Sequence, residues 1–280
     1  MDIAIVNDLF MPFEKLDRAC LDRGIFFGDG VYEVMRSYHG RIFALDEHLA
    51  RFQRSCRQIE IHNVDIGTVK DKIVQAFDKA GYDNAKIYFH LTRGSEPRNH
   101  LPSKNLEPNF FLTVNSLSEK AGDKETGIRV CTCPDTRWKR CDIKSLNLLP
   151  NILARMQAEK KGCSEAILVD DTGHITEGAG SAFFVINAKD KTIITRPLGP
   201  EILPSITRAA VLDLAQKAGL IPLQQPVMSG RAARADEMFL AVTTKDIVPV
   251  AEFDGQLIGS GKPGKFTVAL IELFRKMVRP

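Results

Sequence analysis

A polar segment near the middle of the chain constrains the fold most. Residues 115–127 (NSLSEKAGDKETG) contain few apolar side chains and two glycines, the composition of a connection between domains. With 280 residues and 44% hydrophobic content, the parts on either side are long enough to bury cores of their own. The sequence therefore predicts a small domain at residues 1–115, a linker at 116–127 and a large domain at 128–280.

Helical and strand-like patterns occur in both parts. Apolar residues at helical spacing predict a helix over residues 46–61, and Thr68 with Asp71 forms a weak capping box for a second helix over 68–81. Further helices are expected at 149–161, 206–218 and 266–277. Runs of branched and aromatic residues predict strands at 85–92, 110–114, 128–132, 166–169, 182–186, 192–195 and 238–242. The expected fold class is α+β, with a small α/β domain and a larger β-rich domain that also contains helices.

The charge balance excludes several kinds of partner. Lys and Arg number 38 against 35 Asp and Glu, and the net charge of +3 is spread without the basic blocks that nucleic acids or membranes require. Six cysteines show no zinc spacing, so no metal site is expected. The N-terminal run MDIAIVNDLF lacks the pattern of a secretory signal, and no window approaches 18 apolar residues. These features predict a cytoplasmic protein that binds small anionic ligands.

Residues 140–151 (RCDIKSLNLLPN) place Lys144 beside Ile143, in an expected short strand just before a helix. Burial lowers the pKa of a lysine and leaves more of the neutral amine that forms an imine with an aldehyde. More often, such a lysine extends its amino group to solvent or pairs with an acid. The residues alone therefore leave both alternatives open.

Glu177 is expected at the end of a strand in HITEGAGSAFFVI, after a hairpin turn at residues 170–173. Small residues at 178–181 allow another group to approach the backbone closely. A carboxylate that faces a pyridine nitrogen keeps it protonated, so that the ring accepts electrons. An ordinary surface charge at a strand end is the alternative.

Three segments together resemble the fold-type IV enzymes that depend on pyridoxal 5'-phosphate (PLP). KSLNLLPN around Lys144, the TEGAGSAFFVI run and DRGIFFGDGVYEV at residues 22–34 occur in the order of that family. The family includes D-amino-acid aminotransferases, branched-chain aminotransferases and aminodeoxychorismate lyase. The resemblance implies a Schiff base between PLP and Lys144, which also acts as general base, and a contact between Glu177 and the ring nitrogen. It also implies a two-domain fold with the active site between the domains and near the interface of a homodimer.

The resemblance further implies that the cofactor phosphate lies at the start of a helix. Ser205 in LPSITR is a candidate N-cap, and the first backbone N–H groups of a helix form an anion site. Contacts with the phosphate and the ring are implied for Arg51, Leu203, Ile206, Thr207 and Thr243. The sequence departs from the D-amino-acid enzymes at Pro204, Ser205, Val242 and residues 178–180, so we expect one or two hydrogen bonds to the phosphate or the ring to be missing.

Substrate preference depends on residues 91–102 (LTRGSEPRNHLP). Arg98 and His100 are two apart, so in an extended loop both face one side, and with the hydroxyl of Tyr32 they resemble the carboxylate trap of D-alanine aminotransferases. Arg36 instead resembles an arginine of the branched-chain enzymes. The PRNH segment is longer and more specific than a single arginine, so we expect a D-amino-acid aminotransferase. It would transfer the amino group of D-alanine to 2-oxoglutarate by a ping-pong reaction through pyridoxamine phosphate, giving pyruvate and D-glutamate. A branched-chain L-aminotransferase is the alternative, followed by aminodeoxychorismate lyase.

Two other classes of protein fit less well. A non-catalytic binding protein on this scaffold would not need both Lys144 and Glu177. Glycines at positions 24, 28 and 30 lack the G-x-G-x-x-G spacing of a dinucleotide site. The expected partners are therefore amino acids and 2-oxo acids.

Overall fold

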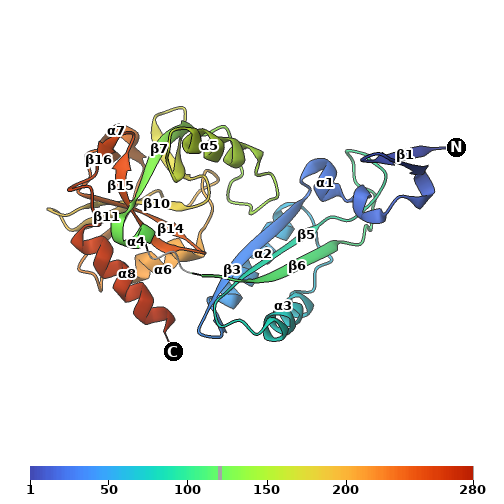
Figure 1. Cartoon of the computed structure of the whole chain (residues 1–280), viewed down its shortest axis with the longest axis horizontal. Helices are drawn as coiled ribbons and strands as arrows, with labels where there is room; N and C mark the ends of the chain where they lie inside the picture. The colour runs from blue at the N-terminus through green and yellow to red at the C-terminus, as the bar shows by residue number, and fades with distance from the viewer. Residues whose placement is uncertain (119–121, 280) are drawn as a thin grey trace.

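The structure is a computed structural model that describes residues 1–118 and 122–279. It has two lobes, each built around a sheet with helices packed against it (Figure 1). One lobe contains a four-stranded sheet and the other a ten-stranded sheet. This mixed architecture confirms the expected α+β fold class.

The smaller sheet has the strand order β4-β3-β5-β6. Its strands are β3 (Gly30–Tyr38), β4 (Arg41–Ile42), β5 (Ala85–Thr92) and β6 (Asn109–Ser116). Every second residue of β5 is buried against the helices α2 (Leu45–Gln58) and α3 (Ile66–Ala80). The rings of Phe52 and Phe89 meet edge to face at 5.0 Å, and this packing fixes α2 on the sheet.

The larger sheet has the order β12-β11-β10-β14-β15-β7-β8-β9-β13, with β16 beside β15. Its strands are β7 (Ile128–Pro134), β8 (Glu165–Val169), β9 (His174–Gly178), β10 (Ala182–Asn187), β11 (Thr192–Thr195), β12 (Ile221–Gln224), β13 (Val227–Met228), β14 (Glu237–Val242), β15 (Asp246–Phe253) and β16 (Gln256–Leu257). Its helices are α5 (Leu149–Lys160), α6 (Ile206–Ala215), α7 (Ser229–Ala232) and α8 (Lys265–Val278). Because β10 is buried on both faces, Phe184 joins the core under α6 and α8 while Phe183 joins the core on the other face.

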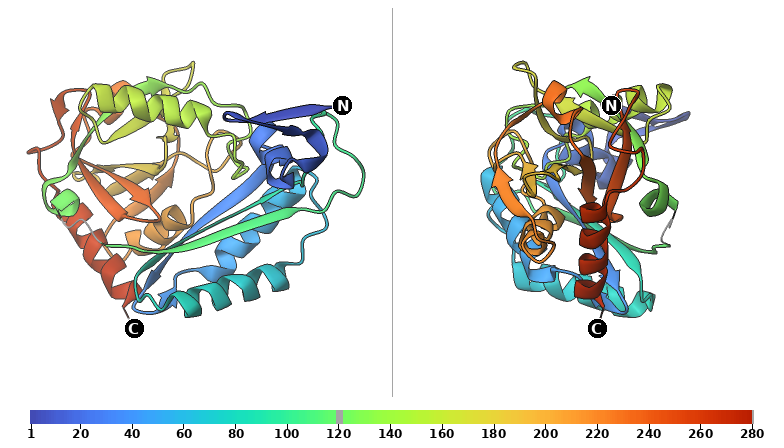
Figure 2. Two further views of the ribbon diagram at one scale, coloured as in Figure 1. Left: turned by 45° about the vertical axis from the view of Figure 1, so that its right-hand side comes forward. Right: turned by 90° about the vertical axis from the view of Figure 1, so that its left-hand side faces the viewer.

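The N-terminal hairpin of β1 (Ile3–Val6) and β2 (Leu9–Pro12) lies beside α1 (Arg23–Phe27), at the end of the smaller lobe (Figure 2). Two 3-10 turns, Phe13–Lys15 and Arg18–Leu21, connect it to α1. None of the helices in the described part of the chain is long and apolar enough to cross a membrane.

All the helices and strands predicted by residue range are confirmed, with shifts of up to three residues at their ends. The predicted cap of α3 is wrong: Asp65 accepts the N–H of Gly67 at 3.0 Å, and Thr68 donates to Asp65 from the first turn. The segment proposed as a linker contains the end of β6 and a short helix, α4 (Gly122–Thr126), while residues 119–121 lie outside the described residues. The domain boundaries remain a prediction.

A buried carboxylate joins the two lobes. Asp246, at the start of β15, accepts hydrogen bonds from Arg36 at 2.9 Å and from Lys124 at 2.8 Å. Tyr38 donates to the same carboxylate, and Arg36 also binds the carbonyl of Thr244 at 3.2 Å. Since Arg36 and Tyr38 belong to β3, this cluster fixes the smaller sheet against the turn between β14 and β15.

We expect Asp246→Asn to destabilise the protein by about 3 kcal/mol, because it leaves buried cations without a compensating charge. Asp123→Asn is the control. Asp123 pairs with Lys245, which is half-exposed and directly precedes Asp246 in the sequence, so the loss of this ion pair should cost less than about 1 kcal/mol. Urea unfolding measures both changes. Equal stabilities of the two variants would contradict the structural role of Asp246.

Candidate active site

A cavity lies between the lobes and is lined by residues of both. Six of the residues expected to contact the cofactor or the substrate line it: Tyr32, Arg51, Lys144, Glu177, Leu203 and Thr243. Backbone with small side chains, residues 178–182, forms another part of its lining. The fold therefore brings together an amine, a carboxylate and a guanidinium that are distant in the sequence.

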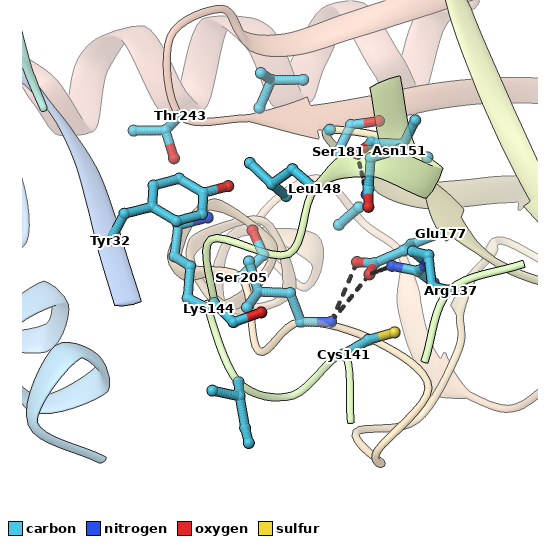
Figure 3. Close-up of a pocket in the computed structure, with 18 of the residues that line it drawn as sticks. Tyr32, Arg137, Cys141, Lys144, Leu148, Asn151, Glu177, Ser181, Ser205 and Thr243 are labelled. Atoms are coloured by element: carbon cyan, nitrogen blue, oxygen red, sulfur yellow. Dashed lines mark hydrogen bonds and ion pairs between the residues drawn. The ribbon is translucent and has the colours of Figure 1, made fainter. Parts of the chain in front are cut away.

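Lys144 lies in an irregular segment before α5, so the predicted strand is wrong. Only the next residue, Ser145, forms a bridge to Val31, and a single bridge does not extend into a ladder. The carbonyl of Lys144 accepts the N–H of Tyr32 at 2.9 Å, which ties the segment to β3. The amino group of the half-buried Lys144 lies 4.4 Å from the centre of the Tyr32 ring. Figure 3 shows the two side chains next to each other.

Glu177 is buried on β9 and faces Arg137 across 2.5 Å (Figure 3). It also accepts the N–H of Leu203 at 3.2 Å, while Asp135 holds the other side of Arg137 through two hydrogen bonds of 2.9 and 2.7 Å. Burial raises the pKa of Glu177, and Arg137 provides the strongest opposing effect. Sequence reasoning missed Arg137, since nothing in the run DTRWKR indicates a partner forty residues away.

Arg51 reaches the cavity from α2 and is held by Glu33 of β3. Its Nε and Nη2 both donate to the Glu33 carboxylate at 2.7 Å, and its Nη1 donates to the carbonyl of Pro204 at 3.0 Å. Burial raises the pKa of Glu33, but the charge and hydrogen bonds of Arg51, together with His48, outweigh burial and hold the pKa at about 2. Burial lowers the pKa of His48, so this ring is neutral and the trio carries one charge of each sign.

The turn before α6 lies beside Arg51. Ser205 caps the helix by accepting the N–H of Arg208 at 3.2 Å, and it lines the cavity. Ile206 and Thr207 are not among the lining residues, but they occupy the first turn of α6, where backbone N–H groups lack partners within the helix. Arg51 and this turn together form a positively polarised corner of the cavity.

Three other residues considered for substrate binding lie outside this cavity. Arg98 and His100 are exposed, and both contact the ring of Phe27. Arg36 is buried against Asp246 and does not line the cavity, although Tyr32 on the same strand does. The expectation that Arg98, His100 and Tyr32 converge is therefore not met within one copy of the chain.

The family model for class IV amino-transferases matches residues 30–253, which include the cavity residues on both lobes. The chain belongs to the class IV aminotransferases. It is 39% identical to a D-alanine aminotransferase of Bacillus licheniformis over 88% of this chain and 86% of that protein, and 35% identical to one of Staphylococcus haemolyticus over 99% and 98%. A crystal structure of the branched-chain amino acid aminotransferase of T.th., with pyridoxamine 5'-phosphate, has a TM-score of 0.86 at 25% identity and covers 98% of this chain and 94% of that one.

Class IV aminotransferases use PLP, and the side chains of this cavity match its functional groups. An amine is needed for the aldehyde, a carboxylate for the ring nitrogen and positive polarity for the phosphate. Lys144, Glu177 and the corner formed by Arg51 and the start of α6 provide these three in one cavity. The residues present therefore fit the cofactor of this aminotransferase.

We expect Arg137→Gln to move the acidic limb of the pH profile of kcat/KM to higher pH. Arg137 lowers the pKa of Glu177, so its removal raises that pKa and the carboxylate becomes protonated at a higher pH. Arg140→Gln is the control, because Arg140 lies in the same segment but pairs with Asp142. An acidic limb that stays in place for Arg137→Gln would show that this arginine does not keep Glu177 ionised.

Proposed function

We propose that this aminotransferase acts on D-amino acids and transfers the amino group of D-alanine to 2-oxoglutarate. The observation that carries the chemistry is the presence of Lys144 and Glu177 in one cavity between the lobes. Near full-length similarity to D-alanine aminotransferases supports the choice of substrate. The burial of Arg36 against Asp246 removes the residue that favoured a branched-chain enzyme.

The residues divide the chemistry among them. Bound PLP supplies an electron-accepting ring that stabilises the charge left when the bond between the α-carbon and its hydrogen breaks. Lys144 would hold the cofactor through its Nζ. Once the amino group of the substrate has displaced this amine from the cofactor, the free Nζ would take the α-proton and return it later in the same half-reaction. Glu177 keeps the ring nitrogen protonated, while Arg51 with the N–H groups of Ile206 and Thr207 binds the phosphate. We place Leu203 against the ring and Thr243 beside the phosphate.

The purified enzyme should consume D-alanine with 2-oxoglutarate in a ping-pong pattern. Lys144→Ala should lower kcat by about a thousandfold or more, because it removes the nucleophile and the base together. Lys139→Ala, at an exposed lysine five positions away, should leave kcat unchanged. Consumption of L-leucine alone would favour the branched-chain alternative, and consumption of aminodeoxychorismate alone would favour the lyase.

We further propose that the enzyme is a homodimer. Leu149, Ile152, Leu153 and Met156 form an apolar stripe along α5, and each of these side chains is about half exposed or more. Arg98 and His100 lie outside the cavity of their own chain. In a dimer, the loop that carries them would complete the substrate site of the partner copy. Tyr32, which lines the cavity, would then supply the third contact with the substrate carboxylate.

Ile152→Asp should convert the dimer to a monomer, because it places a charge in the apolar stripe. Gln157→Asp adds the same charge at an exposed position beside the stripe and should leave the dimer intact. Light scattering coupled to size-exclusion chromatography gives both masses. A monomeric wild-type protein, or a dimeric Ile152→Asp variant, would contradict this interface.

The six cysteines fit a reducing compartment. All of them are free thiols, and Cys56, Cys131 and Cys133 are buried. Burial raises the pKa of Cys56 to about 12, so this thiol stays protonated and unreactive. We therefore propose a cytoplasmic location.

A further inference from the structure

A buried arginine supports the loop that carries Arg98 and His100. Arg23, on α1, is only 3% exposed and donates to four acceptors. Its Nη1 binds the carboxylate of Glu96 at 2.8 Å and the carbonyl of Asn99 at 2.6 Å, while its Nη2 binds the carbonyl of His100 at 3.0 Å. Two of these bonds go to backbone carbonyls, so Arg23 fixes the path of the loop itself.

The ring of Phe27, one turn further along α1, forms the surface on which this loop rests. The guanidinium carbons of Arg23 and Arg98 lie 4.9 and 5.1 Å from the ring centre, and the rings of Phe27 and His100 are 5.5 Å apart. Residues 97–100 are exposed, and exposed loops without such contacts adopt many conformations. Arg23 and Phe27 therefore select one arrangement of the loop.

The charges around Arg23 leave Arg98 available to an anion. Arg23 is neutralised by Asp29 and Glu96, each at 2.8 Å. Arg98 forms no ion pair within residues 1–118 and 122–279. The loop thus presents a cation whose charge no carboxylate of the described residues compensates.

We propose that Arg23 is a positioning residue that holds Arg98 and His100 in the arrangement that binds the carboxylate of the amino-acid substrate. This inference rests on the proposed role of Arg98 and His100. Arg23 acts through the loop and does not touch the substrate. A lysine in its place would keep the charge but lose the planar fork that binds Glu96 and both carbonyls together.

Arg23→Lys should raise KM for D-alanine about tenfold or more and leave kcat within about twofold, because it weakens carboxylate binding without touching Lys144. The inhibition constant of propanoate, which has the carboxylate but no amino group, should rise in parallel. Arg93→Lys is the matched control. Arg93 binds the same Asp29 at 2.8 and 3.0 Å but binds Ile59 and Glu60 in place of the loop, so its KM should not change.

A parallel Arg98→Ala variant separates this inference from the proposed function. If Arg98→Ala raises KM and Arg23→Lys does not, Arg23 has no positioning role and the proposed carboxylate site stands. If neither raises KM while D-alanine is consumed, both assignments fail.

In a chain that already carries Arg98→Ala and His100→Ala, Arg23→Lys should have no further effect on KM, and a persisting effect would overturn the inference. Should Arg23→Lys not fold, Glu96→Gln keeps an acceptor but removes the negative charge that pairs with Arg23 on the loop side, so it should raise KM in the same direction.

Discussion

Strand β3 carries polar side chains into the interior of the protein, and the cavity between the lobes depends on how they are paired. Successive residues of a strand face opposite sides, so Glu33 turns toward α2 while Tyr32 and Arg36 turn toward the larger lobe. Glu33 holds Arg51, and Arg36 holds Asp246. A buried charge is tolerated only with a partner of opposite sign. These two pairs therefore fix the position of β3 against α2 on one side and against the larger lobe on the other. Tyr32 is thereby placed at the cavity.

The cavity separates its acid from its amine. Glu177 lies on the wall formed by the larger sheet, with Arg137 and Asp135 behind it, while Lys144 lies beside Tyr32 near the smaller lobe (Figure 3). A ligand between them meets a carboxylate at one end and an amine at the other, as an aromatic aldehyde with a ring nitrogen requires. Each of these groups is supported by residues from another segment of the chain, so the arrangement is set before any ligand binds.

The sequence predicted those parts of the fold whose apolar residues repeat regularly. The strands β5 and β11 were predicted at their observed ends, because β-branched and aromatic residues fill them. β3 was not predicted, since its interior positions include Glu33 and Arg36, whose partners lie 18 and 210 residues away. The motifs around Lys144 and Glu177 indicated both residues. Their spacing alone did not reveal Arg137 or show that Arg98 and His100 lie outside the cavity, because both depend on tertiary structure.

The residue to which the cofactor is attached can be identified by chemical reduction. Borohydride reduction of the holoenzyme, followed by proteolysis and mass spectrometry, locates any lysine linked to PLP through a reducible carbon–nitrogen bond. We expect the mass of the reduced cofactor on the peptide that contains Lys144. A label on another lysine, or no covalent label on an enzyme that is active and contains PLP, would contradict it.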